Sequence, residues 1–348
     1  MKWDEFSQAI KKKYNYSFFE NIFSLLAGKK IMVIGETIID CYQYVSPMSK
    51  SPKGNLIATH FQKEEQFSGG VLACANHIAE FCKKTKLVSC LGEIDSKIDF
   101  VLNNINFKIE SKLFSRKGAQ TTVNTRFVDV NNCHTKFFGV YKFEHSMFPE
   151  ELEKEVFDFL SNELEKFDLV VVVDYGHGFF TEKIIDVICN KAKFLALNVQ
   201  TNSTNYGFNV ISKFSRADYV CLDELEALLA VRDRFADVED AIIKIAKMMK
   251  ADRVNITLGK KGSLSYSSKE NNICKIPAIL TDSKDTVGTG DSYLSFTSPC
   301  TLVGMPPDAL GFIGSIVGSL ASKIVCNEKA VSVEEIKTFL RRFYDECN

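Results

Sequence analysis

Residues 169–178 have the sequence LVVVVDYGHG, a short apolar run followed by a carboxylate and two glycines. The run is mostly β-branched, which predicts a buried strand. Helical patterns lie on both sides of it, at 150–165 and 182–190. Parallel strands need such long crossovers, so this arrangement predicts a parallel sheet. Asp174 follows the strand at the edge where open α/β sheets bind their ligands.

The same alternation extends along most of the chain. Predicted strands lie at Ile31–Ile34, Leu87–Leu91, Leu169–Val173, Phe194–Leu197, Tyr219–Leu222 and Arg253–Leu258. Predicted helices lie at Val71–Phe81, Glu150–Glu165, Glu182–Asn190 and Ala236–Lys250. We therefore predict an α/β fold, a three-layer α/β/α sandwich with a mostly parallel central sheet.

Two segments depart from this rhythm. Gln43–Gln66 and Thr121–Phe143 alternate polar and apolar residues in the manner of exposed antiparallel strands. They predict a small β lid, which would cover a site or form a homodimer interface. Residues 1–28 predict a helical N-terminal extension, and 29–348 a single domain that contains the lid segments at about 43–66 and 121–143.

Composition limits the partners. The 43 basic residues nearly cancel the 44 acidic ones, so no overall field would attract nucleic acid or an anionic membrane. Gly311–Val325, the longest apolar stretch, is shorter than a membrane span and predicts a buried helix. The 11 cysteines form no CxxC pair, which is typical of reduced thiols in the cytoplasm. A small-molecule substrate is the partner we expect.

The chemistry is concentrated in D-T-V-G-T-G-D, residues 285–291, which precedes the helical pattern Ser292–Ser298. Glycines at the start of a helix let backbone N–H groups converge on an anion, and the helix dipole favours the same charge. Asp291 would then lie where it can accept a proton from an attacking hydroxyl. The simpler interpretation is that Asp291 only caps the helix.

The sequence D-T-V-G-T-G-D-S-Y, from Asp285, resembles the carboxy-terminal signature of the PfkB carbohydrate kinases, D-x-x-G-A-G-D-x-F. The resemblance implies a ribokinase-like fold with Asp291 as catalytic base. Gly288, Thr289 and Gly290 would form the anion hole, with Thr289 in place of the usual Ala. It also implies a monovalent cation such as K⁺ near Asp285, as in several relatives.

Further matches run in the family's order from about residue 30 to 330. Asp40 resembles the carboxylate that binds substrate hydroxyls, and Gly69-Gly70 resembles the amino-terminal G-G signature. Residues 174–178, D-Y-G-H-G, resemble the D-Y-x-K-G of the bacterial heptose-7-phosphate kinases, the kinase half of the ADP-heptose synthesis proteins. His177 replaces the Lys of that subgroup. The resemblance implies that Asp40, Gly69, Gly70 and Asp174 bind substrate.

Two other motifs imply a site for ATP and Mg²⁺. Residues 223–226, D-E-L-E, resemble the family's N-x-x-E, with Glu226 organising Mg²⁺ through water. Residues 257–262 resemble T-x-G-x-x-G, which approaches the ATP phosphates. The implied nucleotide-site residues are Asn198, Asp223, Thr257, Gly259 and Gly262. An acidic helix start would equally explain residues 223–226.

Some positions depart from the heptose kinases. Val71–Cys74 lacks their sugar-binding Asn, and the nearest one is Asn76. Asn124 stands where they carry Lys, and the later lid Arg is missing from Phe138–Tyr141. Arg126 keeps a fork suited to phosphate. A sugar phosphate, a neutral sugar and a modified heptose therefore all stay open. We expect no counterpart of the nucleotidyltransferase half after Lys329.

We predict an ATP-dependent kinase that phosphorylates a hydroxyl of a sugar or sugar phosphate. Two alternatives stay open. One is a nucleoside or vitamin kinase of the same superfamily. The other is a non-catalytic nucleotide- or sugar-binding protein that retains the fold, which the replacements Ala73, Asn124 and Asp223 would suit.

Overall fold

The computed structural model describes residues 2–50, 53–54, 56–279 and 282–345. The helices are α1 (Trp3–Lys13), α2 (Tyr16–Leu26), α3 (Val71–Ala79), α4 (Ile98–Asn104), α5 (Glu150–Glu163), α6 (Glu182–Lys191), α7 (Glu224–Ala230), α8 (Val238–Met249), α9 (Thr289–Leu302), α10 (Pro307–Ala321) and α11 (Val333–Asp345). The strands are β1 (Lys30–Gly35), β2 (Thr37–Lys50), β3 (Ile57–Gly70), β4 (Lys84–Gly92), β5 (Ile109–Arg116), β6 (Thr122–Asp129), β7 (Asn132–Lys142), β8 (Leu169–Asp174), β9 (Leu195–Val199), β10 (Tyr219–Asp223), β11 (Arg253–Thr257), β12 (Ser263–Ser267) and β13 (Asn272–Ile276).

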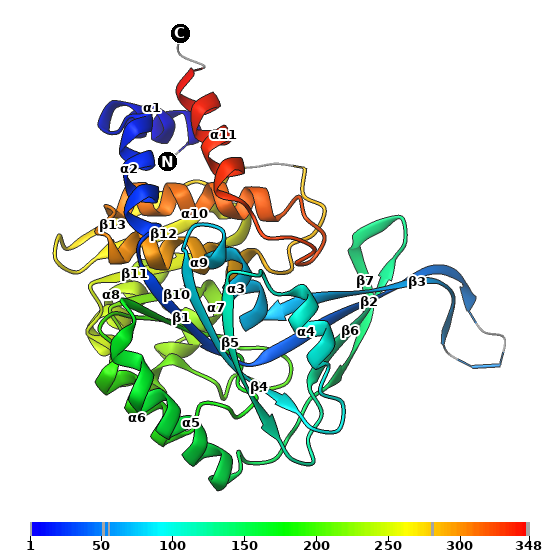
Figure 1. Cartoon of the computed structure of the whole chain (residues 1–348). Helices are drawn as coiled ribbons and strands as arrows, with labels where there is room; N and C mark the ends of the chain where they lie inside the picture. Colours follow the sequence, from blue (N-terminus) through cyan, green and yellow to red (C-terminus); the bar gives the residue numbers. More distant parts are fainter. Residues whose placement is uncertain (1, 51–52, 55, 280–281, 346–348) are drawn as a thin grey trace.

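The central sheet has the order β13-β12-β11-β10-β9-β8-β1-β4-β5 (Figure 1). The neighbouring strands β5, β4, β1, β8, β9, β10 and β11 run parallel, and β12 and β13 add an antiparallel edge. The carboxyl ends of the parallel strands therefore meet at one edge of the sheet. The predicted mostly parallel α/β sandwich is confirmed.

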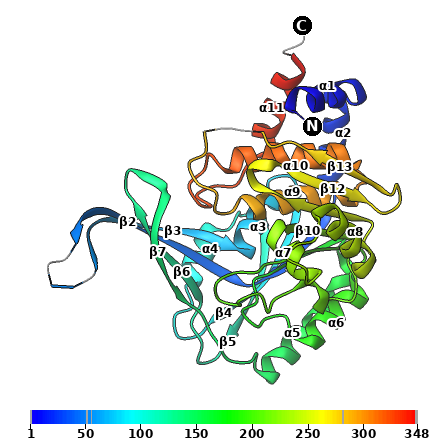
Figure 2. The same cartoon turned by 180° about the vertical axis from the view of Figure 1, so that it is seen from behind.

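Alternating strand residues fill two separate cores. In β1, Ile31 and Val33 pack with α3, α9 and α10, whereas Met32 and Ile34 pack with α5, α6 and α8. This follows from the two-residue period of a strand, since successive side chains point to opposite faces. Helices thus cover both faces of the sheet, as Figure 2 shows from behind.

The first two helices belong to the first of these cores. Phe6, Phe19 and Leu26 are buried in it. The rings of Phe6 and Phe19 contact Phe312 of α10, which in turn contacts Phe343 of α11. Figure 1 shows α1, α2 and α11 side by side above the sandwich.

The lid is a separate four-stranded sheet with the order β3-β2-β6-β7. The sequence predicted antiparallel strands, and this holds for the hairpins β2–β3 and β6–β7. The inner pair is different, because β2 and β6 run parallel. The physical reason is that β2 follows β1 and β6 follows β5, and the parallel strands β1 and β5 both end at the carboxyl edge of the main sheet. Both hairpins therefore start from the same edge. Residues 51, 52 and 55 of the predicted lid lie outside the described residues.

Two sequence expectations concern the chain as a whole. The helices in the described ranges are all too short or too polar to cross a bilayer, and Gly311–Val325 lies largely in the buried helix α10. In the same ranges every cysteine is free of disulfides.

Candidate active site

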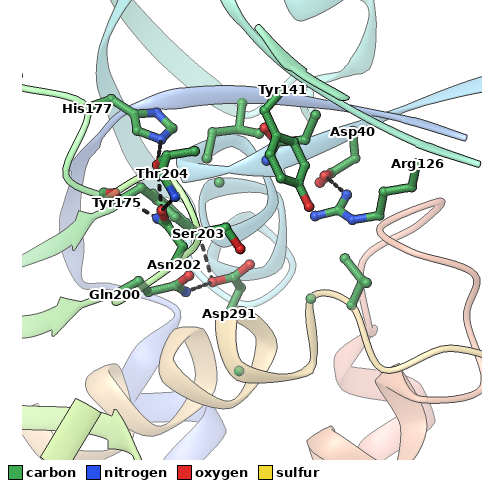
Figure 3. Close-up of a pocket in the computed structure, with 16 residues that line it drawn as sticks. Asp40, Arg126, Tyr141, Tyr175, His177, Gln200, Asn202, Ser203, Thr204 and Asp291 are labelled. Atoms are coloured by element: carbon green, nitrogen blue, oxygen red, sulfur yellow. Dashed lines mark hydrogen bonds and ion pairs between the residues drawn. The ribbon is translucent and has the colours of Figure 1, made fainter. Parts of the chain in front are cut away.

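A cavity of about 210 Å³ lies between the lid and the carboxyl edge of the main sheet (Figure 3). Three parts of the fold line it: the inner face of the lid, the loops after β8 and β9, and the start of α9. The lining side chains are mostly polar, which suits a ligand rich in hydroxyl groups.

The lid places a row of polar groups over the cavity. Asp40 on β2 pairs in register with Asn124 on β6, which pairs with Tyr141 on β7. Cross-strand neighbours share a face of the sheet, so these three side chains and Arg126 all face inward. The Arg126 guanidinium forms an ion pair with the Asp40 carboxylate. A side chain at Gly69 would collide with that carboxylate, because its Cβ would lie 2.2 Å from Asp40 Oδ2.

The opposite wall is the first turn of α9. Gly288 precedes the helix with φ 82°, a left-handed conformation that favours glycine, and its Cβ would lie 2.0 Å from Asn327 Oδ1. The hydrogen-bond ladder begins where the Ser292 N–H donates to the Gly288 carbonyl, 3.0 Å away. The Gly290 N–H therefore has no acceptor inside the helix, whereas the Thr289 N–H donates to Thr286, 3.3 Å away.

Asp291 sits in this first turn and faces the cavity. Its Oδ1 accepts hydrogen bonds from the Tyr175 hydroxyl, at 2.8 Å, and from Gln200 Nε2, at 3.1 Å. Burial raises the pKa of Asp291 to about 6, although both hydrogen bonds lower the pKa and the charge of Asp40 raises it. A carboxyl with this pKa is a carboxylate near neutral pH and can accept a proton.

The loop after β8 is held by Glu36 and by side chains of the loop after β9. The buried Glu36 carboxylate accepts the N–H groups of Tyr175, at 2.9 Å, and of His177, at 3.1 Å. Asn202 and Asn205 donate to the Tyr175 carbonyl from the loop after β9, at 2.8 and 3.1 Å. Tyr175 is therefore held through its backbone while its hydroxyl contacts Asp291.

His177 also lines the cavity. Its Nε2 lies 3.1 Å from Thr204 Oγ1, and its ring stacks on Phe143 with centroids 5.6 Å apart. Burial lowers the pKa of His177 to about 4, so the imidazole is neutral near pH 7. A neutral imidazole does not supply the charge of the Lys that it replaces.

The structure separates the predicted catalytic and substrate-binding residues into two groups, those at the cavity and those with other surroundings. Asp40, Gly70, Arg126, Gly288, Gly290 and Asp291 line the cavity. Thr289 and Gly69 lie immediately beside it, with Thr289 Oγ1 donating to Thr286 O.

Asp174 and Asn76 have other surroundings. The fully buried Asp174 carboxylate accepts hydrogen bonds from the Gly176 N–H and from Asn209, and it pairs with Lys213. The Asn76 amide bonds the backbone of Asn104 and Asn106, away from the cavity. Both side chains therefore brace loops in this structure, and a substrate contact by either stays a prediction.

The predicted nucleotide residues lie along the same edge of the sheet. Asn198 is buried and donates to Cys221 O. Asp223 and Glu226 form a capping box on α7, in which each carboxylate accepts the other's N–H. Thr257, Gly259 and Gly262 surround the turn after β11, and a second cavity of about 330 Å³ lies beside Leu258, Lys261 and Ser263.

Several lining residues were not among the predicted site residues. They are Ile38, Asn124, Tyr141, Tyr175, His177, Gln200, Asn202, Ser203, Thr204 and Val287. The polar composition of residues 200–203 is compatible with a site lining, but a solvated loop has the same composition. Tyr141 gave none, because only the pairing of β6 with β7 brings it over the cavity.

Comparison with known proteins identifies the family of the chain. The profile of the pfkB family carbohydrate kinases matches residues 28–323. The chain belongs to this family. The match spans the central sheet, the lid and α9, and it confirms the resemblance noted in the sequence.

Curated relatives include the bifunctional protein HldE of Campylobacter jejuni, 26% identical over 320 residues, and that of Desulfatibacillum aliphaticivorans, 25% identical over 280 residues. These alignments cover 90% and 78% of this chain, but the chain spans only 65% and 55% of those proteins.

Solved structures share the fold at lower identity. Phosphofructokinase-2 from Escherichia coli, solved in complex with substrates and products, superposes with a TM-score of 0.71 at 13% identity. The same enzyme in complex with potassium gives 0.71 at 14% identity. Ribokinase from Thermotoga maritima gives 0.69 at 18% identity. Each comparison covers 90% of this chain and 99% of the other, which confirms the ribokinase-like fold.

Proposed function

We propose that this pfkB family member transfers the γ-phosphate of ATP to a hydroxyl group of a sugar. The observation that supports this most is the position of Asp291. Its carboxylate faces the cavity from the first turn of α9, opposite the polar face of the lid. A base beside free helix N–H groups is what phosphoryl transfer to a hydroxyl requires.

In the mechanism, Asp291 accepts the proton of the attacking hydroxyl. The hydrogen bonds from Tyr175 and Gln200 fix the orientation of the carboxylate, so that Oδ2 is the oxygen left to accept this proton. The N–H groups of the first turn of α9, that of Gly290 among them, stabilise the negative charge on the transferring phosphoryl. Catalysis of this kind consists mainly of positioning and electrostatic stabilisation.

The lining of the cavity favours a neutral, polyhydroxylated acceptor. Arg126 is the only cation among the described lining residues, and it is already paired with Asp40. Within the described residues, buried Asn124 Oδ1 has no hydrogen-bond partner, so a substrate hydroxyl donating there would satisfy it. The sequence resemblance to heptose kinases and the HldE relatives make heptoses the first sugars to test.

ATP and Mg²⁺ would lie toward β10 and β11. Glu226 Oε2 accepts the Asp223 N–H at 2.8 Å, and Oε1 accepts the Thr201 N–H at 3.2 Å. One lone pair on each oxygen stays available, which suits a carboxylate that holds Mg²⁺ through water. Burial raises the pKa of Glu226 to about 8, with a smaller contribution from Asp223, and a nearby cation would lower it again.

We also infer that a second copy of the chain covers the outer part of the lid. Strands β2 and β3 project from the body as a two-stranded arm (Figures 1 and 2). The arm exposes the apolar side chains Met48, Leu56, Ile57 and Phe61. A two-stranded ribbon is marginal in water by itself, and a symmetric dimer would bury these side chains.

ADP release tests the proposed function. We would measure it with Mg·ATP against heptoses, heptose phosphates, hexoses, pentoses and nucleosides, with wild type and Asp291→Asn. We expect stimulation by a sugar in the wild type and a loss of about 100-fold or more in the variant. Stimulation by nucleosides alone would favour the nucleoside kinases. Binding of ATP without turnover on any acceptor would favour a non-catalytic protein.

A further inference from the structure

Asp285, the first residue of the glycine-rich segment, is fully buried and surrounded by donors. Its Oδ1 accepts the N–H groups of Thr286, at 2.8 Å, and Val287, at 3.2 Å. Its Oδ2 accepts the Tyr42 hydroxyl at 2.6 Å and the Cys326 N–H at 3.0 Å. This carboxylate therefore holds together the glycine-rich loop, strand β2 of the lid and the segment after α10.

A fifth donor is a lysine from the lid. Lys136 on β7 places Nζ 2.9 Å from Asp285 Oδ1 and 3.0 Å from the Cys133 carbonyl. The same ammonium lies 5.6 Å from the centre of the Tyr42 ring, in a cation–π contact. Two oxygens and an aromatic face thus surround a positive charge at the buried end of a side chain that is 25% exposed.

These contacts do not fit a monovalent cation at Asp285. A carboxylate has about four lone-pair sites, and five donors already occupy them. A cation bound to either oxygen would also lie close to the Lys136 ammonium, and like charges repel strongly in a buried setting. The Lys136 ammonium therefore already neutralises the negative charge of the Asp285 carboxylate.

We propose that Lys136 is a built-in substitute for the monovalent cation, so that this protein's anion hole is formed without K⁺. The inference rests on the proposed kinase function only where activity is measured. Its structural part, the ion pair between β7 and the glycine-rich loop, stands on the geometry alone.

A second contact from the same strand supports this role. The Nε2–H of His134 donates to the Ser283 carbonyl, 2.6 Å away, two residues before Asp285. Lys136 and His134 together dock β7 on the loop that continues into Val287 and Gly288, which line the cavity. Lys136 is thus a positioning residue: it acts on the site through Asp285 and does not reach the cavity itself.

The test compares KCl with tetramethylammonium chloride at equal ionic strength. The melting temperature is measured first, because it does not depend on any acceptor. We expect the wild type to melt at the same temperature in both salts. Lys136→Met should melt at a lower temperature, and KCl should raise that temperature because K⁺ can enter the vacated position. Lys136→Arg, which keeps the charge, should melt independently of the salt.

Lys63→Met is the matched control. Lys63 also comes from the lid, pairs with a carboxylate, Glu65, at 2.8 Å, and lies 4.6 Å from the centre of a tyrosine ring, that of Tyr44. It does not contact the glycine-rich loop, so its replacement should leave both melting temperature and salt response close to wild type.

Activity provides the second readout. With an acceptor found in the ADP-release panel, Lys136→Met should lower kcat on the order of 10- to 100-fold, because a displaced anion hole no longer meets the phosphoryl. K⁺-specific stabilisation or activation of the wild type would overturn the inference, as would a Lys136→Met that K⁺ does not stabilise. If no acceptor is phosphorylated, the proposed function fails, and the melting data still decide the role of Lys136.

Discussion

The hydroxyl of Tyr175 tunes the group that we propose as the catalytic base. It donates to Asp291 Oδ1 at 2.8 Å from a loop that is itself held by Glu36, Asn202 and Asn205. A donor to the charged form stabilises the carboxylate and lowers its pKa, which offsets part of the effect of burial. Tyr175 therefore influences the pH range in which Asp291 can act.

The pH profile of kcat/KM should report this contact. Asp291 must be ionised to accept a proton, so wild-type kcat/KM should fall as the pH falls through about 6. Tyr175→Phe removes a donor to the carboxylate, which raises the pKa of Asp291 and moves the acid limb to higher pH. At pH 6 the loss should reach up to about tenfold, and it should be smaller at pH 8.

Tyr219→Phe is the control for this substitution. Its buried hydroxyl donates to Thr297 Oγ1 at 2.7 Å, inside the core and away from the cavity. It should cost stability without moving the acid limb. An acid limb at the same pH in Tyr175→Phe and wild type would show that the hydroxyl does not tune the base.

At the scale of elements, apolar runs made the main sheet predictable. β8 and β10 coincide with the predicted strands to within one residue, because a short, uninterrupted apolar run that ends in a carboxylate has few alternatives. The lid was predicted in outline, but its register was not. Asp40 and Asn124 are 84 positions apart, and only the pairing of β2 with β6 places them over one cavity. Polar strands carry no pattern that specifies such pairing.

Partners distant in sequence also limited the site prediction. Asp174 is the last residue of β8, at the position that the resemblance to the family requires, yet Asn209 and Lys213, more than 30 residues later, bind its carboxylate. A sequence motif names the residue at a position, whereas the neighbours of that residue depend on how the loops fold. The position of Asp291 in the first turn of a helix was predictable because its setting, a glycine turn and a helix start, is local.

The helix α2 offers a direct test of whether residues 1–28 form part of the core. Leu26 is fully buried in the core beside β1, whereas its neighbour Leu25 is 56% exposed. Leu26→Ala should lower the free energy of unfolding by about 2–5 kcal/mol. Leu25→Ala should change it by less than about 0.5 kcal/mol. Urea denaturation measures both, and equal effects would mean that α2 is a loosely attached extension.

At the scale of the whole molecule, the lid serves two regions of the structure. Its base packs on the glycine-rich loop, where Tyr42, Val128, Val287 and Cys326 form an apolar cluster. Its outer arm extends away from the body (Figures 1 and 2). Since β2 runs through both regions, a partner on the arm would hold the same strand that carries Asp40 over the cavity.

The oligomeric state tests whether that partner is a second copy. Ile57 and Phe61 on β3 are 64% and 55% exposed, which is costly for a monomer unless another surface covers them. We expect the wild type to sediment with twice the mass of one chain at micromolar concentration, and Ile57→Asp/Phe61→Asp with the mass of one. Phe235→Asp, which replaces an exposed side chain between α7 and α8, should leave the wild-type mass unchanged. A monomeric wild type would exclude the arm as a dimer interface. A double variant that keeps the doubled mass would exclude it as well, because an apolar contact cannot accommodate two buried carboxylates without partners.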